Sequence, residues 1–460
     1  MTEMQRRLFP WALLIGAFSL RAPALASGLW FDEIWLLSNI GSQSLGETLT
    51  TFKSDNNHPL YSILSWFSVQ AFDGGPISLR LVAVLFGSLS VVAAYHLAAA
   101  LLPHGTAVVL SLALMVSSHH IAFSTNARGY TALLFFSLSA CFWFHRDLRG
   151  DHRYAWWRCA IALALASFVH LTGVFLSVGL LVAALIDRRR ASVRILFLAG
   201  ALSLLLHAPL LRQMLAFFRR DRPEVAAGVS WTDPFWALGE VFQSFGVSWS
   251  VGLIGLLGAL GVGVVGCRAL WKSNRWFVVA TLVSPTILLC FLLAMGRNIW
   301  PRLFFCFAGL VFLIGLQGAA VLSANVSGRV RHALSIALLV GCAWGVPVVW
   351  TVPPQDFPAA AEGALALARP TDRIVTVGLA GFPYESIYPQ PFQHVETVDE
   401  LNELRAEADR LLVLYTFPVH LQSRHVALWE LLAAEATELS RTAGRAGGGA
   451  LVLLSVPGRD

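Results

Sequence analysis

Charged residues are scarce in this chain: they make up 13% of its 460 residues, about half of the roughly 25% that is usual for a soluble domain. So few charges cannot cover a surface that faces water, and 56% of the residues are hydrophobic. Apolar runs of about 20 residues, the length that a helix needs to cross a bilayer, recur along the chain. The composition therefore excludes a cytosolic enzyme and predicts a membrane protein with many spans.

Cysteine and lysine are also scarce. The only lysines are Lys53 and Lys272, and the cysteines have no metal-ligand spacing and lie in or beside apolar runs. This pattern excludes an extracellular disulfide scaffold and indicates that the cysteines are small hydrophobic residues. The net charge of +6 comes mostly from arginines in short loops between apolar runs. Such loops indicate membrane topology and not a surface that binds nucleic acid.

The apolar runs predict about eleven transmembrane helices. They lie near residues 8–26, 77–102, 105–124, 130–145, 156–169, 171–186, 193–211, 249–268, 276–295, 303–323 and 332–350. The runs 156–169 and 171–186 can also form one broken hairpin around the sequence His170-Leu171-Thr172-Gly173. The first run is not followed by a signal-peptide cleavage site, so we expect this helix to be retained.

The distribution of basic residues predicts the orientation. Arginines concentrate in the short loops near residues 6–7, 146–158, 188–194, 268–275 and 329–331. The positive-inside rule therefore places these loops and the N-terminus in the cytoplasm. An odd number of spans then puts the chain after about residue 351 outside, which predicts a multi-pass protein of the cytoplasmic membrane.

Two domains follow from this division. Residues 1–350 form the transmembrane domain, with a first outer loop at 27–76 and a second at 212–248. Residues 351–460 form an extracytoplasmic tail, where charge density rises to soluble values. Its helix-like stretches (359–369, 398–409 and 424–438) alternate with short apolar strands (373–379, 410–416 and 450–456). This alternation predicts a small α/β domain with a partly parallel sheet.

Polar residues gather where apolar runs end on the predicted outer face. Asp32 and Glu33 follow the first run between aromatic residues. A carboxylate in such a low-dielectric place costs free energy unless it acts on a cation or a hydroxyl. The alternative role is that of an acid capping an interfacial helix.

The first outer loop contains Lys53, Asp55, His58 and Tyr61. Asp55 and His58 can share a divalent cation or hydrogen-bond each other, and the alternative is an ordinary polar turn. His58 precedes a proline, which biases its backbone to an extended conformation.

Arginines occupy two outer turns. Arg128 precedes Gly129 and Tyr130, and a similar turn contains Arg297 and Arg302. The guanidinium fork suits phosphate oxygens, although an arginine at a helix boundary can also snorkel to the surface. His170 lies near the same face, where a lone histidine is more often structural. Together these residues suit a lipid-linked anionic substrate, with an acid as general base for an acceptor hydroxyl.

The sequence resembles the integral-membrane glycosyltransferases of the GT-C class, most closely the branch of protein O-mannosyltransferases and the aminoarabinose transferase that modifies lipid A. The resemblance rests on four motifs and on the turn at Arg302. The motifs are Phe31-Asp32-Glu33, His58-Pro59-Leu60-Tyr61, Ala127-Arg128-Gly129-Tyr130 and His170-Leu171-Thr172-Gly173. Two departures concern the subfamily: one proline follows His58 where many relatives have two, and Gly129 stands where proline is frequent.

The resemblance implies a polytopic α-helical GT-C fold and an inverting transfer from a polyprenyl-phosphate sugar to a glycan, lipid or protein acceptor. It implies Asp32 as catalytic base with Glu33 as its supporting neighbour, and Arg128 and Arg302 as partners of the departing phosphate. Tyr130, Arg297 and Lys53 are further candidates for donor binding, and His58, Tyr61 and His170 for other site roles. It also implies a divalent metal ion near the phosphate, with Asp55 and His58 as candidate ligands.

Three other functions fit parts of the pattern. A flippase or transporter of lipid-linked sugars explains the many spans, but transporter sites usually lie near the midplane on broken helices, whereas these ionisable residues gather at one face. A glycan polymerase or ligase would share the substrate. A sensor or scaffold would place the function in the tail. The sugar and the acceptor are not specified by the sequence.

Overall fold

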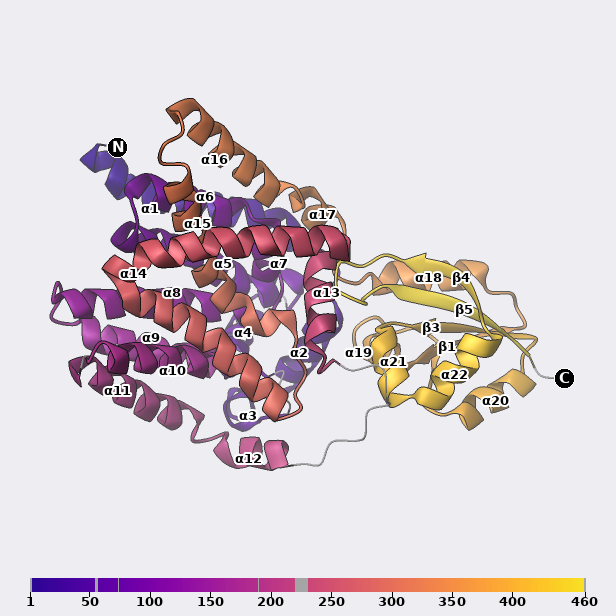
Figure 1. The fold of residues 1–460 in the computed structure, drawn as a ribbon. Helices are drawn as coiled ribbons and strands as arrows, with labels where there is room; N and C mark the ends of the chain where they lie inside the picture. Colours follow the sequence, from indigo (N-terminus) through magenta and orange to yellow (C-terminus); the bar gives the residue numbers. More distant parts are fainter. Residues whose placement is uncertain (1, 54–56, 73, 189, 220–230, 459–460) are drawn as a thin grey trace. The chain divides into compact units, whose positions relative to one another are not determined.

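The computed structural model describes residues 2–53, 57–72, 74–188, 190–219 and 231–458. They form two compact units (Figure 1). The helical unit comprises Met1–Leu25, Gln43–Arg220 and Thr232–Pro347, and the sheet unit comprises Ala26–Ser42, Asp221–Trp231 and Val348–Asp460. The segment that contains Asp32 and Glu33 thus groups with the tail.

Helices dominate the first unit. Its elements are α1 (Glu3–Arg21), η1 (Ala22–Ala24), α3 (Leu45–Thr50), α4 (Pro59–Ala71), α5 (Pro76–Leu101), α6 (His104–Val116), α7 (Ser118–Ser124), α8 (Tyr130–Arg149), α9 (Ala155–Val169), α10 (Gly173–Ile186), α11 (Arg190–His207), α12 (Leu211–Arg219), α13 (Pro234–Ser244), α14 (Trp249–Ala294), η2 (Pro301–Phe304), α15 (Phe305–Leu322) and α16 (Gly328–Ala343). The short helix α17 (Val346–Thr351) follows. A helix lies at every apolar run that the sequence predicted as a span.

Two breaks modify the predicted spans. The run 105–124 forms α6 and α7, which are bent by 58° at Ser117. The runs 249–268 and 276–295 form α14, which has non-helical backbone angles at Asn274. By length and composition, four described helices can cross a membrane, or six if each bent pair counts as one span. The predicted number of about eleven is therefore not confirmed, because several helices, such as α9 and α10, are shorter.

The helical unit is packed around one large apolar core. Its buried members include Val91 on α5, Phe144 on α8, Leu163 on α9, Leu180 on α10 and Phe277 on α14. The backbones of α14 and α15 approach each other closely at Gly266 and Gly318, where a Cβ atom on either glycine would collide with a carbonyl oxygen of the other helix. Small residues allow this close approach in a medium where lipid competes for apolar side chains.

The second unit contains the predicted α/β tail. Its elements are α2 (Phe31–Ser42), α18 (Phe357–Leu367), β1 (Asp372–Val377), η3 (Gly378–Ala380), α19 (Gly381–Ser386), β2 (Gln393–Val395), α20 (Val398–Ala406), β3 (Arg410–Tyr415), α21 (Pro418–Arg424), α22 (Val426–Glu435), β4 (Thr437–Thr442) and β5 (Leu451–Pro457). The strand order is β2-β1-β3-β5-β4. Strand β1 pairs in parallel with β2 and β3, whereas β5 pairs antiparallel with β3 and β4.

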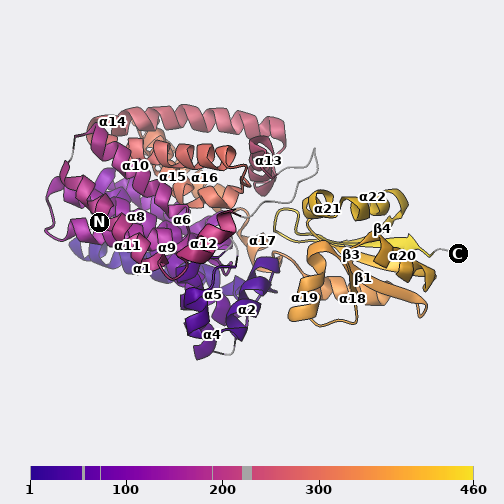
Figure 2. The same ribbon diagram turned by 90° about the horizontal axis from the view of Figure 1, so that it is seen from below.

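Both faces of this sheet are covered by helices. Figure 2 shows α21 and α22 on one face and α18 on the other. Leu421 and Leu428 pack with Val375, Val413 and Val452 in the core of the first face. The small domain and its partly parallel sheet were predicted correctly, and β2 and β4 were missed. Strand β2 has three residues, and β4 is mostly exposed, so neither has the apolar run of a buried strand.

Candidate functional site

The predicted site residues fall into two groups, one in each unit. The helical unit holds the histidines and the arginines, and the sheet unit holds the two acids. Each group is described within its own unit.

Three aromatic side chains meet in the helical unit. His58 is the N-cap of α4, Tyr130 opens α8, and His170 separates α9 from α10. The ring centroids of His58 lie 5.0 Å from Tyr130 and 4.7 Å from His170, and those of Tyr130 and His170 lie 5.9 Å apart. All three side chains are buried. The structure thus brings together residues from three of the four motifs that the sequence analysis singled out.

The glycine of the Arg128 turn makes this packing possible. A Cβ atom on Gly129 would lie 2.6 Å from Cγ1 of Val169 and 2.9 Å from Nδ1 of His58. Both distances are far below van der Waals contact, so any larger residue would displace the His58 ring. The backbone of the turn is closed by the amide of Arg128, which donates to the carbonyl of Asn126 at 2.6 Å.

Two arginines give this cluster a positive potential. Burial, together with the charges of Arg128 and Arg302, lowers the pKa of His170 to about 3. Burial and the same charges hold the pKa of His58 well below its usual value, and the Val169 carbonyl opposes this only in part. Both histidines are therefore neutral at neutral pH. Arg128 is itself buried, whereas Arg302 is half-buried with its guanidinium carbon 4.8 Å from the centre of the Trp300 ring.

The other predicted residues of this unit lie in different settings. Tyr61 is buried, and its hydroxyl donates to the carbonyl of Leu79 on α5 at 2.9 Å. Lys53 is exposed. Arg297 is half-buried, and its amide donates to the Leu292 carbonyl at 2.8 Å after α14. Asp55 lies outside the described residues.

Two buried arginines of this unit were not predicted as functional. Arg80 on α5 donates to the carbonyl of Leu25 at 3.0 Å. Arg21 on α1 donates from Nη1 to the Ala17 carbonyl at 2.6 Å, and its Nη2 contacts Nδ1 of His120 at 2.5 Å. An arginine at the edge of an apolar run is a signal for such a buried polar contact. These bonds join α1 to α7 and α5 to the segment after α1.

The acids occupy the first turn of α2 in the sheet unit. Asp32 is 7% exposed and Glu33 is fully buried. Oε2 of Glu33 accepts from the amide of Trp30 at 3.3 Å, which satisfies a donor at the helix start. The N-terminal end of a helix also stabilises negative charge. This contact holds the Glu33 carboxylate at the start of α2, next to Asp32 in the sequence.

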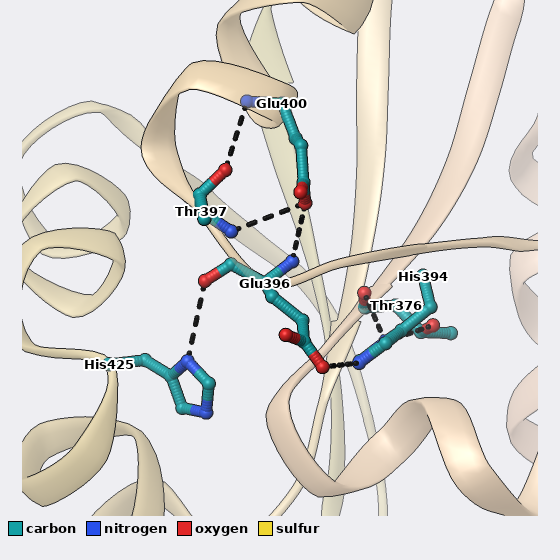
Figure 3. Close-up of polar contacts among 6 residues, drawn as sticks. All are labelled: Thr376, His394, Glu396, Thr397, Glu400 and His425. Atoms are coloured by element: carbon teal, nitrogen blue, oxygen red, sulfur yellow. Dashed lines mark hydrogen bonds and ion pairs between the residues drawn. The ribbon is translucent and has the colours of Figure 1, made fainter.

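A second polar network in the sheet unit involves residues that the sequence analysis did not single out (Figure 3). Thr397 and Glu400 form a capping box at the start of α20. Nδ1 of His394 contacts Oγ1 of Thr376 at 3.2 Å, and Nδ1 of His425 contacts the carbonyl of Glu396 at 3.4 Å. These contacts hold β2 to β1 and anchor α20 and α22, so the network is structural.

Among the described residues, no group of three or more His, Cys, Asp or Glu side chains is placed to hold a metal ion. His58, one of the two candidate ligands, lies near the positive charges of Arg128 and Arg302. Like charges disfavour a divalent cation at that position. The other candidate ligand, Asp55, lies outside the described residues, and no step below depends on a metal.

One protein-family model and several solved structures are similar to this chain. Residues 56–212 match the family model described as dolichyl-phosphate-mannose-protein mannosyltransferase. No curated protein matches the sequence. ArnT from Cupriavidus metallidurans, solved with bound undecaprenyl phosphate, is similar over 99% of this chain and 98% of its own, with 14% identity and a TM-score of 0.56.

Two further solved structures are similar. The oligosaccharyltransferase of Archaeoglobus fulgidus, solved as a complex with Zn and sulfate, has 12% identity and a TM-score of 0.54 over 91% of this chain and 69% of its own. Arabinofuranosyltransferase AftD from Mycobacteria has 14% identity and a TM-score of 0.52 over 99% of this chain and 40% of its own. The chain therefore has the GT-C fold that the resemblance implied.

Proposed function

We propose that this protein is a membrane glycosyltransferase that moves a sugar from a polyprenyl-phosphate donor to an acceptor on the outer face of the cytoplasmic membrane. The observation that carries the proposal is the buried cluster of His58, Tyr130 and His170 beside Arg128 and Arg302. Two arginines near neutral histidines, in a chain with the GT-C fold, provide positive charge that suits a phosphate. The undecaprenyl phosphate bound to ArnT supports this donor chemistry.

The proposed reaction is a single displacement with inversion. The acceptor oxygen forms a bond to the anomeric carbon while the bond from that carbon to the phosphate oxygen breaks. The acceptor proton passes to the carboxylate of Asp32, and polyprenyl phosphate leaves. Because phosphate is a good leaving group, positioning and preorganised charge supply most of the acceleration. Arg128 and Arg302 stabilise the departing phosphate, while Tyr130, Arg297 and Lys53 remain candidates for donor binding.

The test uses purified protein in lipid, a panel of labelled polyprenyl-phosphate sugars and a crude membrane fraction as acceptor. We expect transfer from one donor, loss of transfer in Asp32→Asn, and weaker donor binding in Arg128→Gln. A matched control is Arg441→Gln, because Arg441 is exposed on the edge strand β4 and pairs with Glu438. Full transfer by a folded Asp32→Asn protein would reject the base assignment. Movement of donor between leaflets without product would favour the flippase.

A further inference from the structure

The sheet unit has an edge of the kind that binds ligands in other α/β proteins. Strands β1, β2 and β3 are parallel, and β1 lies between the other two. The connection from β1 leads to β2 on one side, and the chain then crosses to β3 on the other side. The carboxyl ends of β1 and β3 therefore flank a topological switch point, where open α/β sheets usually form a binding crevice.

In this protein the chain itself occupies that position. The ring of Phe31, at the start of α2, packs edge-on against Phe382 and Phe417, with centroid distances of 5.9 and 6.4 Å. Phe382 lies on α19, in the connection that leaves β1, and Phe417 lies two residues after the end of β3. Phe31 thus contacts the segments that leave both strands of the switch point.

Hydrogen bonds fix the backbone of the same segment. The amide of Phe31 donates to Oε1 of Gln355 at 2.9 Å, and the amide of Leu29 donates to the hydroxyl of Tyr388 at 3.0 Å. Nε2 of Gln355 donates to Oγ1 of Thr416, the residue after β3, at 2.9 Å. Gln355 and Thr416 are fully buried.

The orientation of the Gln355 amide is determined by this network. An amide has distinct donor and acceptor ends, and the amide of Phe31 can only donate. Oε1 of Gln355 must therefore face Phe31, and Nε2 must face Thr416. Because amides in the first turn of a helix have no partner within the helix, Gln355 supplies an acceptor that α2 itself lacks.

We propose that the sheet unit positions the base of the transferase, and that Gln355, held by Thr416, is the positioning residue for Asp32. Asp32 follows Phe31 directly, so a backbone fixed at Phe31 fixes the origin of the Asp32 side chain. The catalytic part of this inference depends on the function proposed above, whereas the anchoring of α2 does not. The tail is accordingly part of the catalytic apparatus and not a separate sensor.

The test compares four variants of the full-length protein in lipid. Gln355→Leu removes both hydrogen bonds, and Thr416→Val removes the acceptor that orients Gln355. Thr416→Ser keeps the hydroxyl and is the conservative rescue. Thr437→Val is a matched control, because Thr437 lies on the exposed part of the edge strand β4.

Two readouts are measured on each variant. The first is amide hydrogen exchange of the peptide around Phe31 and Asp32, compared with peptides from β3 and β5. The second is the split of transfer kinetics into kcat and donor KM, with the pH profile of kcat. Exchange reports the anchoring even if no donor is found, so failure of the proposed function remains distinguishable from failure of this inference.

We expect exchange around Phe31 to accelerate about tenfold or more in Gln355→Leu and Thr416→Val, as for a buried hydrogen bond that is lost, while β3 and β5 stay protected. We expect kcat to fall on the order of 100-fold, because small misplacements of a catalytic group are costly. Donor KM should stay constant, the acid limb of the pH profile should move, and Thr416→Ser should resemble the wild type. Unchanged exchange around Phe31, or an equal loss of protection throughout the sheet, would overturn the proposal.

Discussion

The rings of His58 and His170 lie 4.7 Å apart, although one precedes α4 and the other separates α9 from α10. Burial, together with the charges of Arg128 and Arg302, lowers the pKa of both histidines. The two histidine rings are therefore uncharged at neutral pH, and they lie near the positive charges of Arg128 and Arg302. Because the folded protein keeps these histidines neutral and the unfolded chain does not, the stability of the helical unit depends on pH.

We expect His170→Asn to reduce the sensitivity of the fold to acid. The pKa of His170 is about 3 in the folded protein, and its ordinary value in an unfolded chain is about 6.5. The unfolded state therefore binds the proton first as pH falls. The wild type loses up to about 1.4 kcal/mol of stability per pH unit below about 6.5 from this residue. Above that pH the contribution is complete.

The measurement is chemical unfolding in lipid or detergent at pH 7.5, 5.5 and 4.5. The slope of stability against pH should be smaller in His170→Asn than in the wild type. His332→Asn is the matched control, because His332 is exposed on α16, and it should leave the slope unchanged. Equal slopes in all three proteins would contradict the neutral state of His170.

Gly129→Ala should disrupt the same cluster by sterics alone. The added methyl group would overlap Val169 and the His58 ring, and overpacking of this kind typically costs about 1–3 kcal/mol. We expect a lower unfolding temperature and weaker retention of a polyprenyl-phosphate donor. Gly105→Ala is the control, because nothing lies within 4 Å of a Cβ atom at Gly105 on α6. If both variants behave alike, the close packing at Gly129 is unimportant.

The sequence predicted the helical class of the fold because the apolar runs are long. Every predicted run corresponds to a helix, and even the kink at Asn274 falls between two runs that the basic residues near 268–275 had separated. Helices α2 and α4 were not predicted, since both lie in a connecting segment whose charge and punctuation resemble a loop. Strand β4 was missed because it is mostly exposed at the edge of the sheet and has no apolar run.

The candidate site was predictable as a set of residues but not as a geometry. His58, Tyr130 and His170 were singled out from three separate motifs, and only the packing of α4, α8 and α9 shows that their rings meet. The contact between Phe31 and Gln355 spans 324 residues. No local pattern contains such a contact, because its two residues lie far apart in the sequence and meet only in the folded unit. The catalytic and phosphate-binding roles stay predictions.

The contact between α14 and α15 provides a prediction about packing. Gly266→Ala or Gly318→Ala would push a methyl group into a backbone carbonyl of the facing helix, and backbone cannot move aside as a side chain can. We expect either variant to unfold at a clearly lower temperature, with a cost of about 1–3 kcal/mol. Gly263→Ala, on the same helix with nothing within 4 Å, should be neutral. Thermal unfolding in detergent distinguishes these outcomes, and a stable Gly266→Ala protein would refute the close approach.

The ion pair of Asp372 and Arg410 should make the stability of the sheet unit fall at a lower pH than the His170 effect, below about 3.9. Nε of Arg410 donates to Oδ2 of Asp372 at 3.2 Å across the parallel strands β1 and β3. The hydrogen bond from Arg410 lowers the pKa of Asp372. A carboxyl whose pKa is lowered by folding stabilises the protein above its unfolded value of about 3.9 and loses that contribution as pH falls through the folded pKa. Asp372→Asn should therefore be less stable than the wild type at pH 7, and the difference should shrink toward pH 3.

Hydrogen exchange of the β1 and β3 amides in the full-length protein measures this stability directly. Glu438→Gln is the control, because Glu438 also pairs with an arginine but lies on the exposed edge strand β4, where ion pairs contribute little. It should leave the exchange of β1 and β3 unchanged at both pH values. A difference between Asp372→Asn and wild type that persists undiminished at pH 3 would show that the variant acts through packing of the strands and not through the charge of Asp372.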